Sequence, residues 1–143
     1  MIVYVESSVL LRKTMKQEDE FKNWGAWSQA ITSELTYVEC MRSIDRFRLQ
    51  GSIDDQEAAE QINQIHQDLR KFSRVRLYPE VLNRAAQPFI TAVKTLDAIH
   101  LSSALLWQQR SQQALVFLTH DRQLGRAALA CGFQVQDTQS PSS

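Results

Sequence analysis

The sequence predicts a three-layer α/β/α sandwich, in which helices cover both faces of a central parallel sheet of four to five strands. Short apolar stretches alternate five times with stretches of helical character along the 143-residue chain, a pattern typical of parallel strands joined by crossover helices. Only four glycines and three prolines punctuate the chain, so we expect long helices with short connections. In such folds, ligands bind beyond the carboxyl ends of the strands.

The N-terminal part of the chain is predicted to hold two strands separated by helical sequence. IVYV (2–5) is apolar, β-branched and aromatic, without a helical polar face, and therefore predicts a short buried strand. EFKNWGAWSQ (20–29) is compatible with a helix that Gly25 weakens. AITS (30–33) predicts the second strand, which passes directly into a helix.

Two helices are predicted between the second and third strands. The first runs from Glu34 to about Gln50 and ends at Gly51, because glycine commonly terminates helices. Ser52 or Asp54 can cap the second, since their side-chain oxygens accept bonds from N–H groups of the first turn. The apolar residues of this second helix recur at spacings of four and three: Ala58, Ile62, Ile65, Leu69 and Phe72.

The central part of the chain is predicted to supply the third strand and two further helices. RVRLY (74–78) has the composition of a strand, and Pro79 is a favourable first residue for a short helix. Thr95 is a natural N-cap for a mostly apolar helix that runs to about Gln109.

The C-terminal part is predicted to hold the last two strands. ALVFLTH (114–120) is the strongest strand pattern, and a helix follows it to Ala130. Gly132 then permits a turn into the final strand, FQV (133–135).

Composition and charge narrow the classes of function. With 43% hydrophobic and 22% charged residues, the chain resembles ordinary globular proteins. We expect one domain over residues 1–137, followed by a polar tail, 138–143. Sixteen basic and sixteen acidic side chains give a formal net charge of zero. Bulk charge therefore does not indicate a nucleic-acid partner, which would need a local basic patch.

Cysteine usage and hydropathy predict a cytoplasmic protein. Cys40 and Cys131 lie far apart among apolar neighbours, which favours two buried free thiols over a disulfide or a metal site. No apolar stretch approaches the roughly 20 residues needed to span a bilayer. The N-terminus also lacks the basic-then-apolar order of a secretion signal. We expect no membrane contact.

Four carboxylates lie near strand ends or inside otherwise apolar helices: Glu6, Glu39, Asp97 and Asp121. Because they come from four different strand–helix units, they can converge at one edge of a parallel sheet. Two like charges about 4 Å apart repel by roughly 4 kcal/mol at an effective dielectric of 20. Converging carboxylates must therefore bind protons, basic partners or a cation. An all-oxygen cluster without cysteine favours Mg²⁺ or Mn²⁺ over structural zinc.

Three of the acids also have a simpler structural interpretation. Glu6 can be a solvated acid beside a Ser7 or Ser8 helix cap. Asp121 can cap the helix that it precedes, and Asp97 can stabilise the positive end of its own helix. These interpretations require no shared site.

Basic residues near the acids have two interpretations. Arg42 and Arg46 share a helix face with Glu39, so ion pairing can explain all three residues. The alternative is contact with the phosphate groups of a ligand, for which the candidates are Arg12, Arg42, Arg46 and Arg122. His100 and His120 lie close to acids in the sequence, and we expect both to be structural. Trp24 and Trp27 are expected to pack in the core or in a dimer interface, and Trp107 is expected to be a core residue.

Four stretches of the sequence resemble the PIN-domain ribonucleases, and within them the VapC-type toxins of VapBC toxin–antitoxin modules. In chain order they are MIVYVESSVLLR, SELTYVECMRSIDRFR, TLDAIHLSSALL and FLTHDRQLGRAALACGFQV. Their order, their spacing and the length of the chain all match the family, over nearly the whole sequence.

The resemblance implies an α/β/α sandwich and Mg²⁺- or Mn²⁺-dependent hydrolysis of RNA phosphodiester bonds. It places the catalytic and metal-binding acids at Glu6, Glu39, Asp97 and Asp121, with Ser7 and Thr119 as supporting hydroxyl residues. It further implies a homodimer and a cognate VapB-like antitoxin that holds the toxin inactive. In this scheme the bound metal polarises the phosphate and activates the attacking water.

One position departs from the family pattern. The first acid of these proteins is normally an aspartate, and here it is Glu6. The extra methylene moves the carboxylate by roughly a C–C bond of about 1.5 Å, whereas Mg²⁺ requires near-ideal octahedral geometry. The alternative function is therefore a catalytically impaired PIN-fold binding module that acts through antitoxin or dimer contacts. A phosphoacceptor receiver domain fits less well, because the sequence lacks paired acids after the first strand and a lysine after the last.

Overall fold

One parallel sheet organises the computed structural model, which describes residues 1–16, 21 and 23–137. Its strand order is β3-β2-β1-β4-β5. The strands are β1 (Ile2–Val5), β2 (Gln29–Ser33), β3 (Ser73–Val75), β4 (Val116–Thr119) and β5 (Gln134–Asp137). The helices are α1 (Ser7–Thr14), α2 (Leu35–Leu49), α3 (Asp55–Arg70), α4 (Pro79–Ala85), α5 (Thr95–Ser111) and α6 (Arg122–Ala130).

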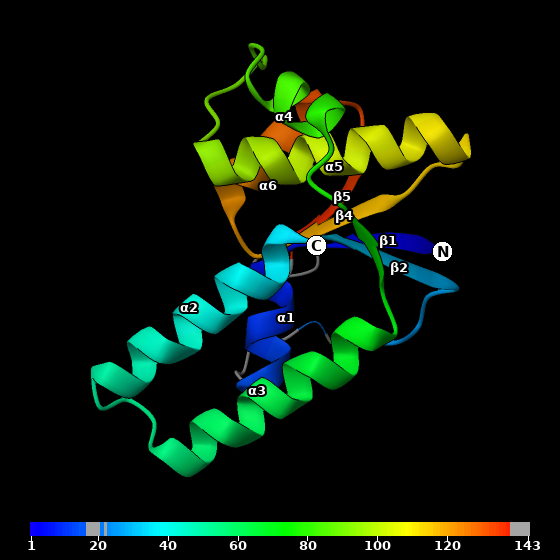
Figure 1. Cartoon of the computed structure of the whole chain (residues 1–143). Coiled ribbons are helices and arrows are strands. Elements are labelled where there is room, and N and C mark those ends of the chain that lie inside the picture. The colour runs from blue at the N-terminus through cyan, green and yellow to red at the C-terminus, as the bar shows by residue number, and fades with distance from the viewer. Residues whose placement is uncertain (17–20, 22, 138–143) are drawn as a thin grey trace.

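Helices cover both faces of the sheet and confirm the predicted sandwich. α1, α2 and α3 lie on one face, and α4, α5 and α6 lie on the other (Figure 1). The alternation of side chains along β1 explains the two layers. Val3 and Val5 are buried with the first group of helices, whereas Tyr4 is buried with the second.

The strand order makes the carboxyl ends of the central strands β1 and β4 the expected position for a ligand. β1 pairs in parallel with β2 through Val3 and Ala30, and on its other side with β4 through Val3 and Val116. The chain therefore winds outward in both directions from the β1–β4 pair. In doubly wound sheets, the crevice at the carboxyl ends of such a pair is the usual ligand position. Glu6 follows β1 directly, and Asp121 follows β4 after one intervening residue.

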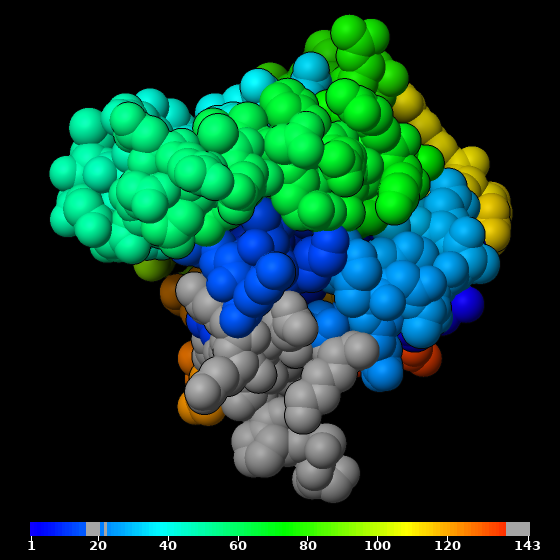
Figure 2. Space-filling model, turned by 90° about the horizontal axis from the view of Figure 1, so that it is seen from below, coloured from blue at the N-terminus to red at the C-terminus, as the bar shows by residue number. Residues whose placement is uncertain are grey.

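The helix predicted over residues 20–29 is wrong within its described part. Residues 23–28 form turns and bends, and Gly25 has a φ of 84°, which does not belong to a right-handed helix. Trp24 and Trp27 pack on each other with ring centroids 5.0 Å apart, and both contact Phe72. Aromatic packing thus replaces helical hydrogen bonding here. Figure 2 shows α3 crossing this face above α1 and the turn segment.

The remaining predicted boundaries differ by a few residues. β3 ends at Val75, and β5 begins at Gln134. Lys94 rather than Thr95 is the N-cap of α5, and no side chain caps that helix. Of the two predicted N-caps of α3, Ser52 and Asp54, the structure has Asp54. Its carboxylate accepts the Glu57 N–H at 2.7 Å in a capping box.

Other features of the chain agree with the sequence. Both cysteines are free, with Cys40 buried and Cys131 partly buried. Among the described residues, no helix combines the length and the apolar character needed to cross a membrane. The expected polar tail, 138–143, lies outside the described residues.

Candidate active site

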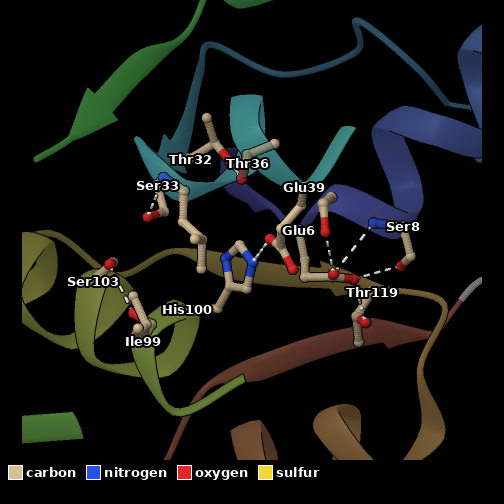
Figure 3. Close-up of polar contacts among 12 residues, drawn as sticks. Glu6, Ser8, Thr32, Ser33, Thr36, Glu39, Ile99, His100, Ser103 and Thr119 are labelled. Atoms are coloured by element: carbon tan, nitrogen blue, oxygen red, sulfur yellow. Dashed lines mark hydrogen bonds and ion pairs between the residues drawn. The ribbon is translucent and has the colours of Figure 1, made fainter. Parts of the chain in front are cut away.

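Glu6 lies at the junction of β1 and α1, and both oxygens of its carboxylate accept hydrogen bonds. The residue is only 5% exposed, and its backbone N–H donates to the Leu118 carbonyl oxygen of β4 at 3.2 Å. Its Oε1 accepts from Ser7 Oγ at 2.8 Å and from the Ser8 N–H at 3.2 Å. Its Oε2 accepts from Ser8 Oγ and from Thr119 Oγ1, the latter at 3.0 Å (Figure 3).

These contacts correct the expectation for the helix cap. Glu6 is itself the N-cap of α1, so a solvated acid beside a Ser7 or Ser8 cap is wrong. A carboxylate offers about four acceptor positions, and four donors use them here. The longer side chain of glutamate therefore folds back onto the start of α1 and the end of β4. Ser7 and Thr119 lie beside this acid, as the resemblance implies.

Asp121 caps α6, which is the structural interpretation that the sequence left open. Its Oδ1 accepts the N–H groups of Gln123 at 2.9 Å and Leu124 at 3.1 Å. Its own N–H donates to Thr119 Oγ1 at 3.0 Å, which links it to the hydrogen bonds around Glu6. Within the described part of the chain, Oδ2 of Asp121 has no hydrogen bond and remains available as a ligand.

Asp97 is partly removed from water and is influenced by the charges of the other candidate acids. It lies half-buried in the first turn of α5 and has no hydrogen bond to any described residue. Burial raises the pKa of Asp97 to about 6, and the charges of Asp121, Glu6 and Glu39 add to this effect while His100 opposes it. The Asp97 carboxyl group is therefore subject to the charges of the other three predicted acids.

Glu39 is held by a buried histidine rather than by the arginines of its own helix. Its Oε1 lies 2.5 Å from His100 Nε2 (Figure 3). On the other side of the ring, His100 Nδ1 lies 2.8 Å from the Tyr4 hydroxyl oxygen. The interpretation of Glu39 as a partner of Arg42 or Arg46 is thus wrong.

Burial and charge shift the pKa values of both rings in this chain of contacts. Burial alone would lower the pKa of His100, but the bond with Glu39 and the charges of Glu6, Glu39 and Asp97 raise it above its ordinary value. Burial, followed by the charges of Glu6 and Glu39, raises the pKa of Tyr4 well above the usual range. Both shifts act in the same direction and make the loss of a proton from Tyr4 and from His100 less favourable.

Sequence reasoning did not assign Tyr4 or Ser8 to the site, and it expected His100 to be structural. His100 follows Asp97 by three residues, which places both on one face of α5. That spacing is the signal that could have found it. Tyr4 is indistinguishable from a core aromatic by sequence, because only the fold places its hydroxyl against His100. His120 is buried, and its backbone N–H donates to Ser8 Oγ at 3.0 Å.

The donor set suits a hard cation, although the side chains do not yet form a coordination shell. Among the described residues, no three histidine, cysteine, aspartate or glutamate side chains lie close enough together to hold one ion. The donors are all carboxylate oxygens, as Mg²⁺ or Mn²⁺ prefers. Asp97 and Oδ2 of Asp121 are free of hydrogen bonds to described residues, whereas Glu6 would have to release hydroxyl donors first.

The predicted phosphate contacts lie on three helices, α1, α2 and α6. Arg42 is exposed on α2 and pairs with Asp45 at 3.2 Å, and the Arg46 guanidinium lies 5.2 Å from the Phe47 ring centre. Arg12 is partly buried in the last turn of α1, and Arg122 is exposed at the first position of α6, beside Asp121. A role of these four residues toward RNA stays a prediction.

Comparisons with known proteins agree with this architecture. A family model described as "PIN domain" matches residues 3–129. No curated protein matches the sequence.

Three solved structures are similar in fold. PAE2754 from Pyrobaculum aerophilum has a TM-score of 0.63 and 18% identity, over 96% of this chain and 83% of that one. FitAB bound to an IR36 DNA fragment has a TM-score of 0.66 and 13% identity, over 100% and 99% of the two chains. FitAcB from Neisseria gonorrhoeae has a TM-score of 0.64 and 13% identity, over 99% and 100%. At these identities, the similarity shows a shared fold.

Proposed function

This chain belongs to the PIN-domain family, and on that premise we propose that it is a divalent-metal-dependent endoribonuclease. We further propose that it is the VapC-type toxin of a type II toxin–antitoxin module. The observation that carries the proposal is Asp97, a half-buried acid whose pKa is raised to about 6 by burial and by three neighbouring acids. A bound cation or proton would relieve the repulsion between these negative charges. Acids with strongly shifted pKa values are typical of functional sites.

Mg²⁺ or Mn²⁺ would polarise the phosphate and lower the pKa of the attacking water. Asp97 and Asp121 would hold the ion, and Glu39 would complete the acidic pocket while His100 fixes its orientation. Glu6 would join this set once a serine or threonine hydroxyl turns away from it. Because hydroxyl rotation is easy, Ser7 and Thr119 can hold Glu6 in either arrangement.

Partners of the toxin are part of the same proposal. A VapB-like antitoxin is supported by the four sequence stretches that resemble VapC-type toxins. A homodimer is supported by exposed apolar side chains on and around α4 and α5, which water does not favour over a large area. These side chains are Leu82, Ile90 and Leu96.

A catalytically impaired binding module is the second candidate, and the surroundings of Glu6 favour it. Four hydrogen bonds fill the acceptor positions of this carboxylate, so every metal bond to Glu6 must replace one of them. The protein would then act through its antitoxin or its dimer partner. The FitAB structure, which is bound to a DNA fragment, offers one form that such a partnership could take.

Cleavage of RNA with Mg²⁺ or Mn²⁺ separates the two candidates. We expect the wild-type protein to cut RNA and Asp97→Asn to lose activity at least a hundredfold, because the variant removes one ligand charge. Asp55→Asn, an exposed acid at the start of α3, is the matched control and should retain activity. If only Glu6→Asp cuts RNA, the impaired module is correct. If no variant cuts with either ion, the ribonuclease proposal fails.

A further inference from the structure

A hollow of about 320 Å³ lies between the edge strand β3 and the C-terminal half of α5. It is distinct from the acidic site, and no role has been assigned to it so far. Its lining combines apolar or aromatic groups with two arginines: Arg74, Val75, Tyr78, Leu106, Trp107, Arg110 and Ser111. Aromatic surface beside guanidinium groups is the combination with which proteins bind single-stranded nucleic acids.

Arg110 is held in place mainly by a ring. Its guanidinium carbon lies 5.0 Å from the centre of the Tyr78 ring, which is within the range of a cation–π contact. Its ion pair with Glu80 spans 4.0 Å between two half-exposed side chains, and such pairs contribute little. The guanidinium therefore keeps donors for a phosphate, which its planar fork can bind with two bonds.

Arg74 belongs to the densest basic segment beside the hollow. Arg70, Lys71, Arg74 and Arg76 fall within seven residues of a chain whose net charge is zero, and all four are exposed. Within the described part of the chain, none of them forms an ion pair. Of these four residues, Arg74 lines the hollow. The segment therefore places a local excess of positive charge next to the hollow along the chain, as a nucleic-acid partner of a neutral protein requires.

Trp107 offers a flat surface at the same position. It is partly buried against the core between the sheet and α5, and it also lines the hollow. Trp107 therefore packs against the core, as expected, and in addition lines the hollow. A nucleobase that entered the hollow would exchange water for this ring, which favours stacking of any base.

One helix connects the hollow to the acidic site. α5 carries Asp97 in its first turn and Trp107 near its other end. Ten residues of helix at 1.5 Å each separate the two by about 15 Å. A stacked strand covers this distance in about four nucleotides at 3.4 Å each.

We propose that the hollow is a second contact site for single-stranded RNA, a proposal that rests on the ribonuclease function for the identity of the nucleic acid. One base stacks on Trp107, and the flanking phosphates contact Arg74 and Arg110. The scissile phosphate then lies about four nucleotides away, at the acids. The site selects substrates with an unpaired segment of at least this length.

Binding without cleavage tests the proposal in the full-length protein. A fluorescently labelled ten-nucleotide single-stranded RNA is titrated in the Asp97→Asn background without divalent ions, over a series of salt concentrations. Relative to this parent, Arg74→Ala with Arg110→Ala should weaken binding about tenfold. The double variant should also reduce the slope of log K against log salt by about 1.4, since each lost phosphate contact contributes about 0.7. Arg48→Ala, an exposed arginine at the end of α2, is the control and should change neither quantity.

A conservative variant tests stacking separately. Trp107→Phe keeps an aromatic ring in the core, and it should abolish the RNA-induced quenching of tryptophan fluorescence, because Trp24 and Trp27 lie on the opposite face of the sheet. Equal affinity and equal salt slope in the double variant and in Arg48→Ala would overturn the proposal. The proposal would also be overturned if the double variant dissociated a dimer of this chain and left RNA binding unchanged. The hollow would then bind a second copy of the protein. If the protein cleaves RNA and these variants have no effect, the proposal for the hollow fails and the ribonuclease proposal stands. If RNA binds at the hollow but is never cleaved, only the ribonuclease proposal fails.

Discussion

Glu6 and Asp97 carry the same charge at the same edge of the sheet, but their surroundings differ. Glu6 is 5% exposed and accepts four hydrogen bonds from two serines and a threonine. Asp97 is half-buried, has no hydrogen bond to a described residue, and has a pKa raised to about 6. Hydrogen bonds to a carboxylate stabilise its charge, whereas burial beside like charges destabilises it. Glu6 therefore stabilises the fold, whereas ionised Asp97 reduces its stability.

Removal of the Glu6 carboxylate should give the largest effect on stability. Glu6→Ala removes the cap of α1 and leaves buried hydroxyls of Ser7 and Thr119 without their acceptor. We expect the free energy of unfolding to fall by about 2–4 kcal/mol, from the sum of a lost cap and unsatisfied polar groups. Urea denaturation measures this change.

The cap at α3 provides the matched control for that experiment. Asp54→Ala removes an exposed cap, which should cost only about 1 kcal/mol. A loss at Glu6 no larger than at Asp54 would contradict the view that Glu6 organises the junction of β1, β4 and α1.

Neutralisation of Asp97 should have the opposite sign. Because the folded protein raises the pKa of Asp97 to about 6, the native state holds a proton that the unfolded chain has already released between about pH 4 and 6. Wild-type stability should therefore fall as the pH rises through this window. After allowance for solvent screening, Asp97→Asn should be more stable than wild type by about 1–2 kcal/mol at pH 7.5 without metal.

The two proteins should converge in stability below about pH 4, where Asp97 is protonated in both states. Denaturation curves at about pH 3 and at pH 7.5 check this, with Asp55→Asn as the exposed control that should behave as wild type at both values. Equal stability of wild type and Asp97→Asn at pH 7.5 would mean that Asp97 carries no electrostatic strain.

Local patterns in the sequence were sufficient to predict most of the fold. IVYV and ALVFLT have no polar helical face, so they could only be buried strands, and their alternation with helices fixed the class of sheet. The segment 20–29 was predicted as a helix that Gly25 weakens, and this prediction is wrong within its described part. In the structure, the packing of Trp24 and Trp27 on Phe72 comes from tertiary contacts that a local pattern does not contain.

The candidate site was only partly predictable. The positions of Glu6, Asp97 and Asp121 followed from strand and helix ends, because a parallel sheet brings such ends together. The partners of the acids did not follow. The bond between Glu39 and His100 joins residues 61 positions apart, and the bond between Glu6 and Thr119 joins residues 113 apart. These bonds decide which acid is satisfied and which is free, and they depend on the complete fold.

Calorimetric titration with Mg²⁺ tests the central claim, that Asp97 rather than Glu6 is the acid poised to bind a cation. At pH 7.5 we expect wild type to bind Mg²⁺ and Asp97→Asn to lose binding. Glu6→Gln, which keeps an acceptor for the surrounding hydroxyls, should bind with a smaller loss. Binding to wild type should weaken below about pH 6, because protons compete for Asp97. Mg²⁺ affinity that is unchanged in Asp97→Asn, or lost only in Glu6→Gln, would contradict the account.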